Sequence, residues 1–267
     1  MKNGNYKILV LSDLNKATTT TLKSSVSLAN MIDAKIELFH VKKFIDIVDR
    51  DNQLSAIRTL NEEHNNTKKT IEALVKTIST DYNVTIGFSY SFGKIKEEIR
   101  AKIESVKPDI IVLGQRDSNP LQLIGDSITR FILKEFKGII MIASNENALV
   151  PNKKMTLGVF NDSNKIFESK FSQDLITHSE SPLKSFKIIN SQTQLNTTAL
   201  ETEENKIEYV FEQNDNAMTT LSSYLLKNKI NLLCVDRDPS KNKNTTGTSL
   251  KEVISKLNVS LLVSDAL

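Results

Sequence analysis

The residues best suited to contact a ligand come where the apolar runs of the sequence end or where a helical pattern begins. These positions are Asp13, His40, Val41, Gly114, Gly125 and Ser127. In open α/β sheets, ligands bind beyond the carboxyl ends of the strands. A glycine and a serine at a helix N-terminus can offer N–H groups and a hydroxyl to an anion, although such residues also serve simply as loop and capping residues.

Other residue patterns exclude several kinds of site. The eight glycines are never closer than six residues, so the sequence contains neither a Gly-x-Gly-x-x-Gly turn nor a Gly-x-x-x-x-Gly-Lys loop. His40, His64 and His178 are far apart, and Cys234 is the single cysteine, which argues against a zinc site and excludes an intramolecular disulfide. No Gly-x-Ser-x-Gly elbow is present. No side chain is an evident general base, so the sequence predicts a protein without enzymatic activity.

Apolar strands alternate with amphipathic helices along the first half of the chain. Strands are predicted at 8–11, 35–41, 84–90, 109–113 and 138–143, and helical stripes of apolar residues recur at 22–32, 71–78, 95–106 and 128–136. Strands separated by helices favour βαβ units and a parallel sheet, and nearly unbroken apolar strands agree because parallel strands are covered on both faces.

The same pattern returns in the second half of the chain. A shift of 122 residues places 95–141 on the later sequence without a gap, whereas the first strand, 8–13, matches 157–162 at a shift of 149. The difference of 27 residues falls between the second strand and the third helix, so we expect the second half to lack its second helix. The sequence therefore predicts two α/β domains, 1–148 and a trimmed 153–267, with 150–154 as the linker.

Charge and hydropathy indicate the cellular location of the protein and the kinds of partner it lacks. Lysine and arginine number 35 against 32 acidic residues, a net charge of +3 that is evenly scattered and is typical of solvated surfaces rather than of a nucleic-acid binder. The N-terminus lacks a signal-peptide pattern, and no stretch approaches the roughly 18 apolar residues of a membrane span. We expect a cytoplasmic protein with neither a membrane nor a nucleic acid as partner.

In the order of its motifs, the chain resembles the universal stress protein family in its tandem two-domain form. The motifs are KILVLSD ending at Asp13, LFHV ending at Val41, DIIVLG ending at Gly114, and a glycine–serine element that opens the fourth helix. The resemblance is close over 1–145 and looser over 153–267. It implies two tandem five-stranded parallel α/β sandwich domains of the Rossmann-like, adenine nucleotide alpha hydrolase-like type.

The resemblance also implies roles for particular residues of the first domain. In nucleotide-binding members, an acid after the first strand and a backbone group at the end of the second hold adenine, and these positions are Asp13 and Val41 here. A glycine loop then grips the phosphates, and its first and third glycines match Gly114 and Gly125, with Ser127 as the hydroxyl residue. ATP or AMP, with Mg²⁺, is the ligand that this comparison implies.

The phosphate loop departs from the family pattern in both halves. In the first, Asp117 replaces the second glycine, seven residues rather than nine precede Gly125, and Asp126 pushes Ser127 one place late. Two carboxylates repel a polyphosphate unless a divalent cation intervenes. In the second half, Asp236 and Pro239 replace the first two glycines.

Two functions follow as expectations. The first is a non-enzymatic stress-response protein that regulates through a protein or a small ligand. The second is a sensor of ATP or AMP that uses the first domain. The two domains are expected to pair with each other through the last strands, 138–143 and 259–263, in imitation of the dimer that single-domain members form, and a homodimer of the whole chain is a further expectation.

Overall fold

The computed structural model describes residues 6–43, 53–115, 127–161, 170–189, 206–237 and 249–264. The strands in these ranges are β1 (Tyr6–Ser12), β2 (Ala34–Lys42), β3 (Ile86–Phe92), β4 (Ile110–Gly114), β5 (Ile139–Ala143), β6 (Leu157–Phe160), β7 (Leu183–Ile189), β8 (Lys206–Glu212), β9 (Leu232–Asp236) and β10 (Ser260–Ser264). The helices are α1 (Thr18–Ile32), α2 (Gln53–Tyr82), α3 (Ile95–Val106), α4 (Ser127–Glu135), α5 (Lys170–Thr177), α6 (Ala217–Lys227) and α7 (Leu250–Lys256).

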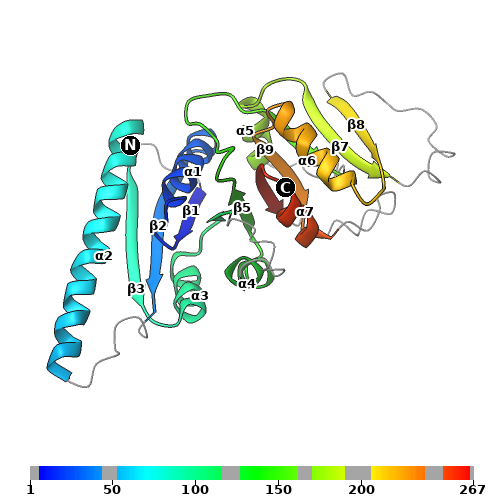
Figure 1. The fold of residues 1–267 in the computed structure, drawn as a ribbon. Helices are drawn as coiled ribbons and strands as arrows, with labels where there is room; N and C mark the ends of the chain where they lie inside the picture. Colours follow the sequence, from blue (N-terminus) through cyan, green and yellow to red (C-terminus); the bar gives the residue numbers. More distant parts are fainter. Residues whose placement is uncertain are drawn as a thin grey trace.

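All ten of these strands form one sheet, in the order β3-β2-β1-β4-β5-β10-β9-β6-β7-β8 (Figure 1). The first five strands pair in parallel, as do the last five. This arrangement confirms the predicted α/β class. None of the helices in the described ranges is long and apolar enough to cross a bilayer.

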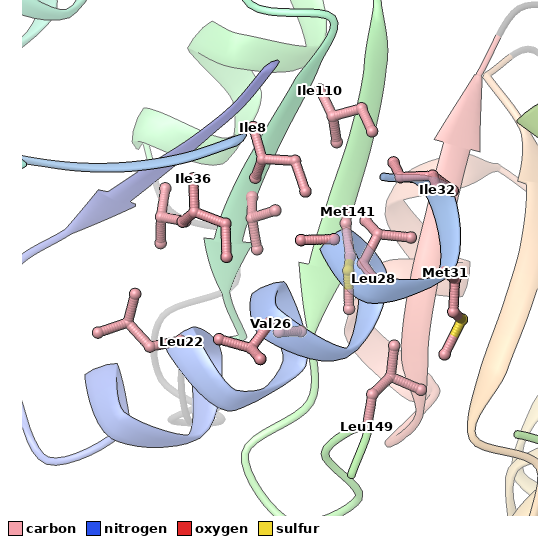
Figure 2. Close-up of a cluster of buried hydrophobic side chains, with 14 of the residues drawn as sticks. Ile8, Leu22, Val26, Leu28, Met31, Ile32, Ile36, Ile110, Met141 and Leu149 are labelled. Atoms are coloured by element: carbon pink, nitrogen blue, oxygen red, sulfur yellow. The ribbon is translucent and has the colours of Figure 1, made fainter. Parts of the chain in front are cut away.

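Helices cover both faces of the sheet, which accounts for the unbroken apolar strands. On one face, α1 buries Leu22 and Val26 against Ile8 and Ile36, and Leu149 closes the same cluster (Figure 2). The other face carries a second cluster, built from α3, α4, α6 and α7. Alternate residues of each strand point to opposite clusters, so every central strand is apolar at both parities.

Helix α2 is much longer than the sequence predicted. The apolar stripe of Ile71, Val75 and Ile78 is buried as expected, but the helix begins eighteen residues before it, at Gln53. Its early part is rich in Asn, Glu and Lys. The helix lies beside β3, the edge strand of the first half (Figure 1). A mostly solvated helix has no full apolar face, so hydrophobic periodicity gives no signal for it.

The second half repeats the first in the predicted register. Strand β9 lies 122 residues after β4, and α6 begins 122 residues after α3. Between β2 and β3 there are 43 residues, and between β7 and β8 only 16, which reproduces the predicted difference of 27. The segment 190–205, in which the second helix was predicted to be absent, lies outside the described residues.

The strands on either side of that shortened segment have changed in character. In the first half, Leu38 of β2 neighbours Phe88 of β3 on the face that α2 covers. The register places Ser185 of β7 beside Glu208 of β8 at the equivalent positions. Lys187 donates a hydrogen bond to this Glu208 at 2.8 Å. Polar side chains thus replace apolar ones where the second half is shorter.

The two halves meet through their last strands. Strand β10 pairs with β5 in antiparallel register, with Leu262 opposite Met141. These are the two strands whose apolar sequences predicted such a contact. Helix α1 also packs against α5, its counterpart in the repeat. The contact between the halves therefore includes the sheet and one of its covering layers.

A reciprocal pair of side chains reinforces this junction. Gln115, just after β4, donates from Nε2 to the carbonyl of Leu257 at the end of α7, at 2.9 Å. Arg237 is its counterpart at a shift of 122, and its guanidinium donates to the carbonyls of Phe136 and, at 2.7 Å, of Gly138 beyond the end of α4. Each side chain thus satisfies carbonyl groups at or just beyond a helix C-terminus of the opposite half, and the positive charge of Arg237 is favourable there.

Replacing Arg237 should weaken the junction measurably. Arg237→Ala leaves part-buried carbonyls without their charged donor, and we expect it to lower the free energy of unfolding by about 2–3 kcal/mol. Arg130→Ala, at an exposed position of α4, serves as the control and should change it by less than about 0.5 kcal/mol. Urea denaturation of both variants measures the difference. Equal losses in the two variants would show that the Arg237 contacts do not hold the halves together.

Candidate functional site

The predicted ligand edge lies where the order of the strands reverses. The chain moves outward from β1 to β2 and β3, and then returns to the other side of β1 to form β4 and β5. The crossover helices on the two sides of β1, α1 and α3, therefore lie on opposite faces of the sheet and open a crevice beyond the carboxyl ends of β1 and β4. The crevice is the topological switch point at which doubly wound proteins bind ligands.

A cavity of about 100 Å³ occupies this crevice. Asp13, Val41 and Gly114 all belong to its wall. Apolar side chains form much of the rest: Leu11, Phe39, Ile95, Ile99, Leu113 and Ile128. The structure thus brings three of the five predicted site residues to one place.

The two remaining predicted residues are Gly125 and Ser127. Ser127 is the first residue of α4, and the two residues after it, Ile128 and Thr129, line the cavity. Gly125 lies outside the described residues, as do Asp117 and Asp126, whose sequence positions depart from the family pattern. The start of α4 therefore faces the cavity, in the position from which a helix N-terminus can contact an anion.

A tight turn sets the position of the Asp13 carboxylate. Leu14 adopts a left-handed conformation with φ of 58°, and its N–H donates to Ser12 Oγ at 2.9 Å. The side-chain amide of Asn15 donates to Asp13 Oδ2 at 3.2 Å. These bonds hold the Asp13 carboxylate in the wall of the cavity.

The N-terminus of α1 forms another part of the wall. Ala17, Thr18 and Thr21 line the cavity, and Asn15 Oδ1 accepts from the N–H of Ala17 at 2.9 Å. The Thr18 hydroxyl lies 2.8 Å from Ser12 Oγ. The positive end of the α1 dipole and these hydroxyls make the wall favourable to an electronegative group.

Gly114 has a structural reason to be glycine. A Cβ at this position would lie 2.7 Å from Thr21 Oγ1, a hydroxyl that donates to the carbonyl of Ala17 at 3.1 Å. The close approach of α1 to the end of β4 therefore excludes a side chain. The family resemblance implies a phosphate-binding role for the same glycine, but its packing against Thr21 would preserve it without any phosphate.

A second cavity, of about 400 Å³, adjoins the first and shares Asp13, Val41 and Ile95 with it. Its other lining residues come from the turn after β1, from the end of β2 and from α2: Leu14, His40, Lys42, Lys43, Glu63, Asn66, Thr67 and Thr70. Sequence reasoning did not find this cavity because the polar part of α2 was not predicted to be helical. In hindsight, Glu63, Thr67 and Thr70 continue the helical stripe of Ile71 and Ile78.

His40 is the buried histidine of this region. Its Nδ1 lies 2.8 Å from the carbonyl oxygen of Ser12, and only 8% of the residue is exposed. Burial lowers the pKa of His40 below its ordinary value, although the bond to Ser12 and the charge of Asp13 act in the opposite direction. The ring is therefore neutral at neutral pH. Within the described ranges, no group of three His, Cys, Asp or Glu side chains is placed to hold a metal ion.

The equivalent edge of the second half is arranged differently. Asp236 ends β9 where Gly114 ends β4, and the side chain of the next residue, Arg237, reaches across the junction to α4. Cys234, two residues earlier in β9, is fully buried, and burial raises the pKa of its thiol to about 12. Asp162, Pro239 and Gly247, the other sequence counterparts, lie outside the described residues.

Together, the strand order, the switch-point crevice and the repeated half define a tandem doubly wound α/β protein. Comparison with protein families gives a match to the universal stress protein family over residues 5–142, just over half of the chain. The chain belongs to the universal stress protein family. Comparison with curated proteins found no match.

Solved structures resemble the whole chain. A universal stress protein from Archaeoglobus fulgidus aligns with a TM-score of 0.67 and 12% identity, covering 98% of this chain and 96% of its own. A functionally unknown protein from Pseudomonas aeruginosa PAO1 aligns with a TM-score of 0.57 and 12% identity, covering 97% and 92%. At such low identity, these likenesses establish the fold.

The packing explanation for Gly114 can be tested by a double-mutant cycle. Gly114→Ala should destabilise the protein by about 1–3 kcal/mol because its Cβ overlaps the Thr21 hydroxyl. In a Thr21→Ala background the same change should cost much less. Gly87→Ala in β3 is the control, since a Cβ there meets Ile36 O at an ordinary 3.6 Å. A full cost of Gly114→Ala in both backgrounds would refute the packing explanation.

Proposed function

We propose that this protein is a non-enzymatic, cytoplasmic stress-response protein whose first half binds a small polar ligand. The observation that carries the proposal is the shared cavity of Asp13, Val41 and Gly114 at the switch point of the first half. The second half supplies a different function at its equivalent edge, because Arg237 there contacts the other half. We infer that the second half acts as a built-in partner of the ligand-binding half.

An adenine nucleotide is the ligand class we propose for the first half. The crevice offers a carboxylate and the backbone of Val41 for a base, and apolar side chains such as Phe39 for its faces. Asp117 and Asp126 in the following loop disfavour a triphosphate. We therefore expect AMP to bind more tightly than ATP in the absence of Mg²⁺, and ATP to gain affinity when Mg²⁺ is added.

A regulatory rather than a catalytic role fits the arrangement of the cavity walls. The Ser12 hydroxyl contacts Thr18 and the N–H of Leu14, with no base among the described residues positioned to activate it. His40 directs Nδ1 to a backbone carbonyl. A ligand bound here would raise the free energy of unfolding and alter the surface near the junction of the two halves. A homodimer of the whole chain would add a further surface for regulation.

Thermal unfolding with nucleotides tests the proposal. At a concentration of about a hundred times Kd, AMP should stabilise the wild-type protein by about 2.7 kcal/mol, which raises Tm by about 5–10 °C. Asp13→Asn should abolish most of this rise. Asp162→Asn, the counterpart in the second half, should leave it unchanged. Absence of any shift with millimolar AMP, ATP or Mg·ATP would refute nucleotide binding.

A further inference from the structure

Strand β8 is the more exposed of the two outer strands that the structure describes. The sheet begins with β3 and ends with β8, which lies at the far end of the molecule from α2 (Figure 1). In β3, Gly87 is the one exposed residue. Helix α2 places His64 against the rings of Tyr90 and Phe92 in that strand. In β8, three of the seven residues are exposed: Ile207, Val210 and Glu212. An uncovered edge of this kind readily pairs with another strand.

Alternate residues of β8 direct their backbone groups away from β7. Ile189 of β7 is the register partner of Glu212, and its carbonyl accepts from the N–H of Gln213 at 2.9 Å. Because a residue in a parallel ladder bonds to the two neighbours of its partner, the odd-numbered residues of β8 bond to β7. The N–H and C=O groups of Glu208 and Val210 therefore point outward, and no described residue bonds to them.

This outward row limits how a second copy of β8 can pair with the first. In an antiparallel pair, residues that exchange hydrogen bonds must both direct their backbone groups toward the other strand. Even-numbered residues must therefore oppose even-numbered residues. The registers that then pair at least five of the seven residues are centred on Glu208, Tyr209 or Val210.

The register centred on Tyr209 joins all seven residues and pairs their side chains favourably. Lys206 would lie opposite Glu212 of the second copy, and such opposite-charge pairs stabilise a two-stranded ladder. Ile207 would lie opposite Phe211, and both side chains are apolar. Because the arrangement is two-fold symmetric, each of these pairs occurs twice, and Tyr209 meets Tyr209 of the second copy at the axis.

The two other registers bring like charges together. Centring the pair on Glu208 sets Glu208 opposite itself, and centring it on Val210 sets Glu208 opposite Glu212. Like charges directly opposite each other destabilise a ladder. In the Tyr209 register, Glu208 instead lies opposite Val210 and keeps its ion pair with Lys187 of the same chain. Charge therefore selects one of the three registers.

An aromatic cluster beside this edge would continue across the axis. The ring of Tyr209 stacks on Phe186 with centroids 5.4 Å apart and lies 5.0 Å from the ring of Tyr224 in α6. Tyr209 and Phe211 are only partly buried in the cluster that this face carries. Ile207, on the same face by alternation, is 41% exposed. Pairing two copies would cover these side chains with their symmetry mates, and burial of such apolar and aromatic surface favours association.

We propose that two copies of this chain associate through antiparallel pairing of their β8 strands, with the two-fold axis at Tyr209. The inference rests on the homodimer of the proposed function and assigns its surface, and it does not require a nucleotide. Pairing of β8 with β8 forms a closed dimer, whereas pairing of β8 with β3 would leave a free edge at every step and build an open filament. The β5–β10 contact within each chain stays unchanged.

Cysteine cross-linking of the full chain tests the register. Tyr209→Cys places two thiols opposite each other in a pair without backbone hydrogen bonds, where Cα atoms lie about 4.5 Å apart, within the span of a disulfide. We expect this variant to form a covalent dimer on oxidation. Ile207→Cys is the matched control at a more exposed position, and its two copies would lie about 13 Å apart, too far to be bridged. Cys234 is fully buried, with its pKa raised to about 12, and should not react.

Sedimentation velocity of charge variants tests the same pairing in solution. At high micromolar concentration the wild-type chain should sediment at about twice the 30.0 kDa of one chain. Lys206→Glu should weaken the dimer about fivefold or more, because it sets two pairs of glutamates opposite each other, and Lys206→Glu combined with Glu212→Lys should restore it. These two positions are about 20 Å apart in one strand, so the rescue reports a contact between copies. Lys35→Glu, at an exposed position of β2, is the control and should dimerise as the wild type does.

The outcomes separate this proposal from the proposed function. A monomeric wild-type chain would refute the β8 pairing and the homodimer together, while nucleotide binding in the thermal unfolding experiment would still stand. A dimer that Lys206→Glu leaves intact, or equal cross-linking of Tyr209→Cys and Ile207→Cys, would refute the β8 surface and leave the homodimer itself. A dimer with the expected losses and no response to any nucleotide would support the β8 pairing and refute nucleotide binding alone.

Discussion

The antiparallel pairing of β5 with β10 is the contact on which the arrangement of the whole molecule depends. Each half on its own would present its last strand as an unpaired apolar edge, and such edges readily pair with other chains. Joining the two edges turns two five-stranded parallel sheets into one ten-stranded sheet. It also buries Met141 and Leu262 opposite each other and brings α1 against α5.

The two halves use their equivalent edges differently at this pairing. Because the last strands are antiparallel, the carboxyl ends of the strands in each half lie near the last helix of the other half. These helices are α4 in the first half and α7 in the second. Gln115 and Arg237 occupy equivalent positions at these edges and bond to opposite helix ends. In the first half, the crevice beside Gln115 keeps a carboxylate, hydroxyls and a close-packed glycine. In the second, the charged side chain of Arg237 stabilises the junction, so the repeated fold carries one proposed ligand site.

Much of this arrangement was predictable from the sequence because local patterns determine it. The 122-residue shift predicted the position of β9 from that of β4, and the apolar last strands indicated where the halves meet. The polar half of α2 was not predictable, since solvated helices lack an apolar period. The cavity between β2 and α2 was missed for the same reason, because it forms where a helix and a strand end meet only in the folded chain. The packing reason for Gly114 likewise depends on Thr21, ninety-three residues away.

Hydrogen–deuterium exchange with bound AMP tests the central claim, that only the first half holds a ligand at its strand ends. The account predicts slower exchange at the ends of β1, β2 and β4, near Asp13, Val41 and Gly114. It predicts no change at the end of β9, where Asp236 and Arg237 lie. Protection at β9 equal to that at β4, or protection confined to the second half, would contradict the account.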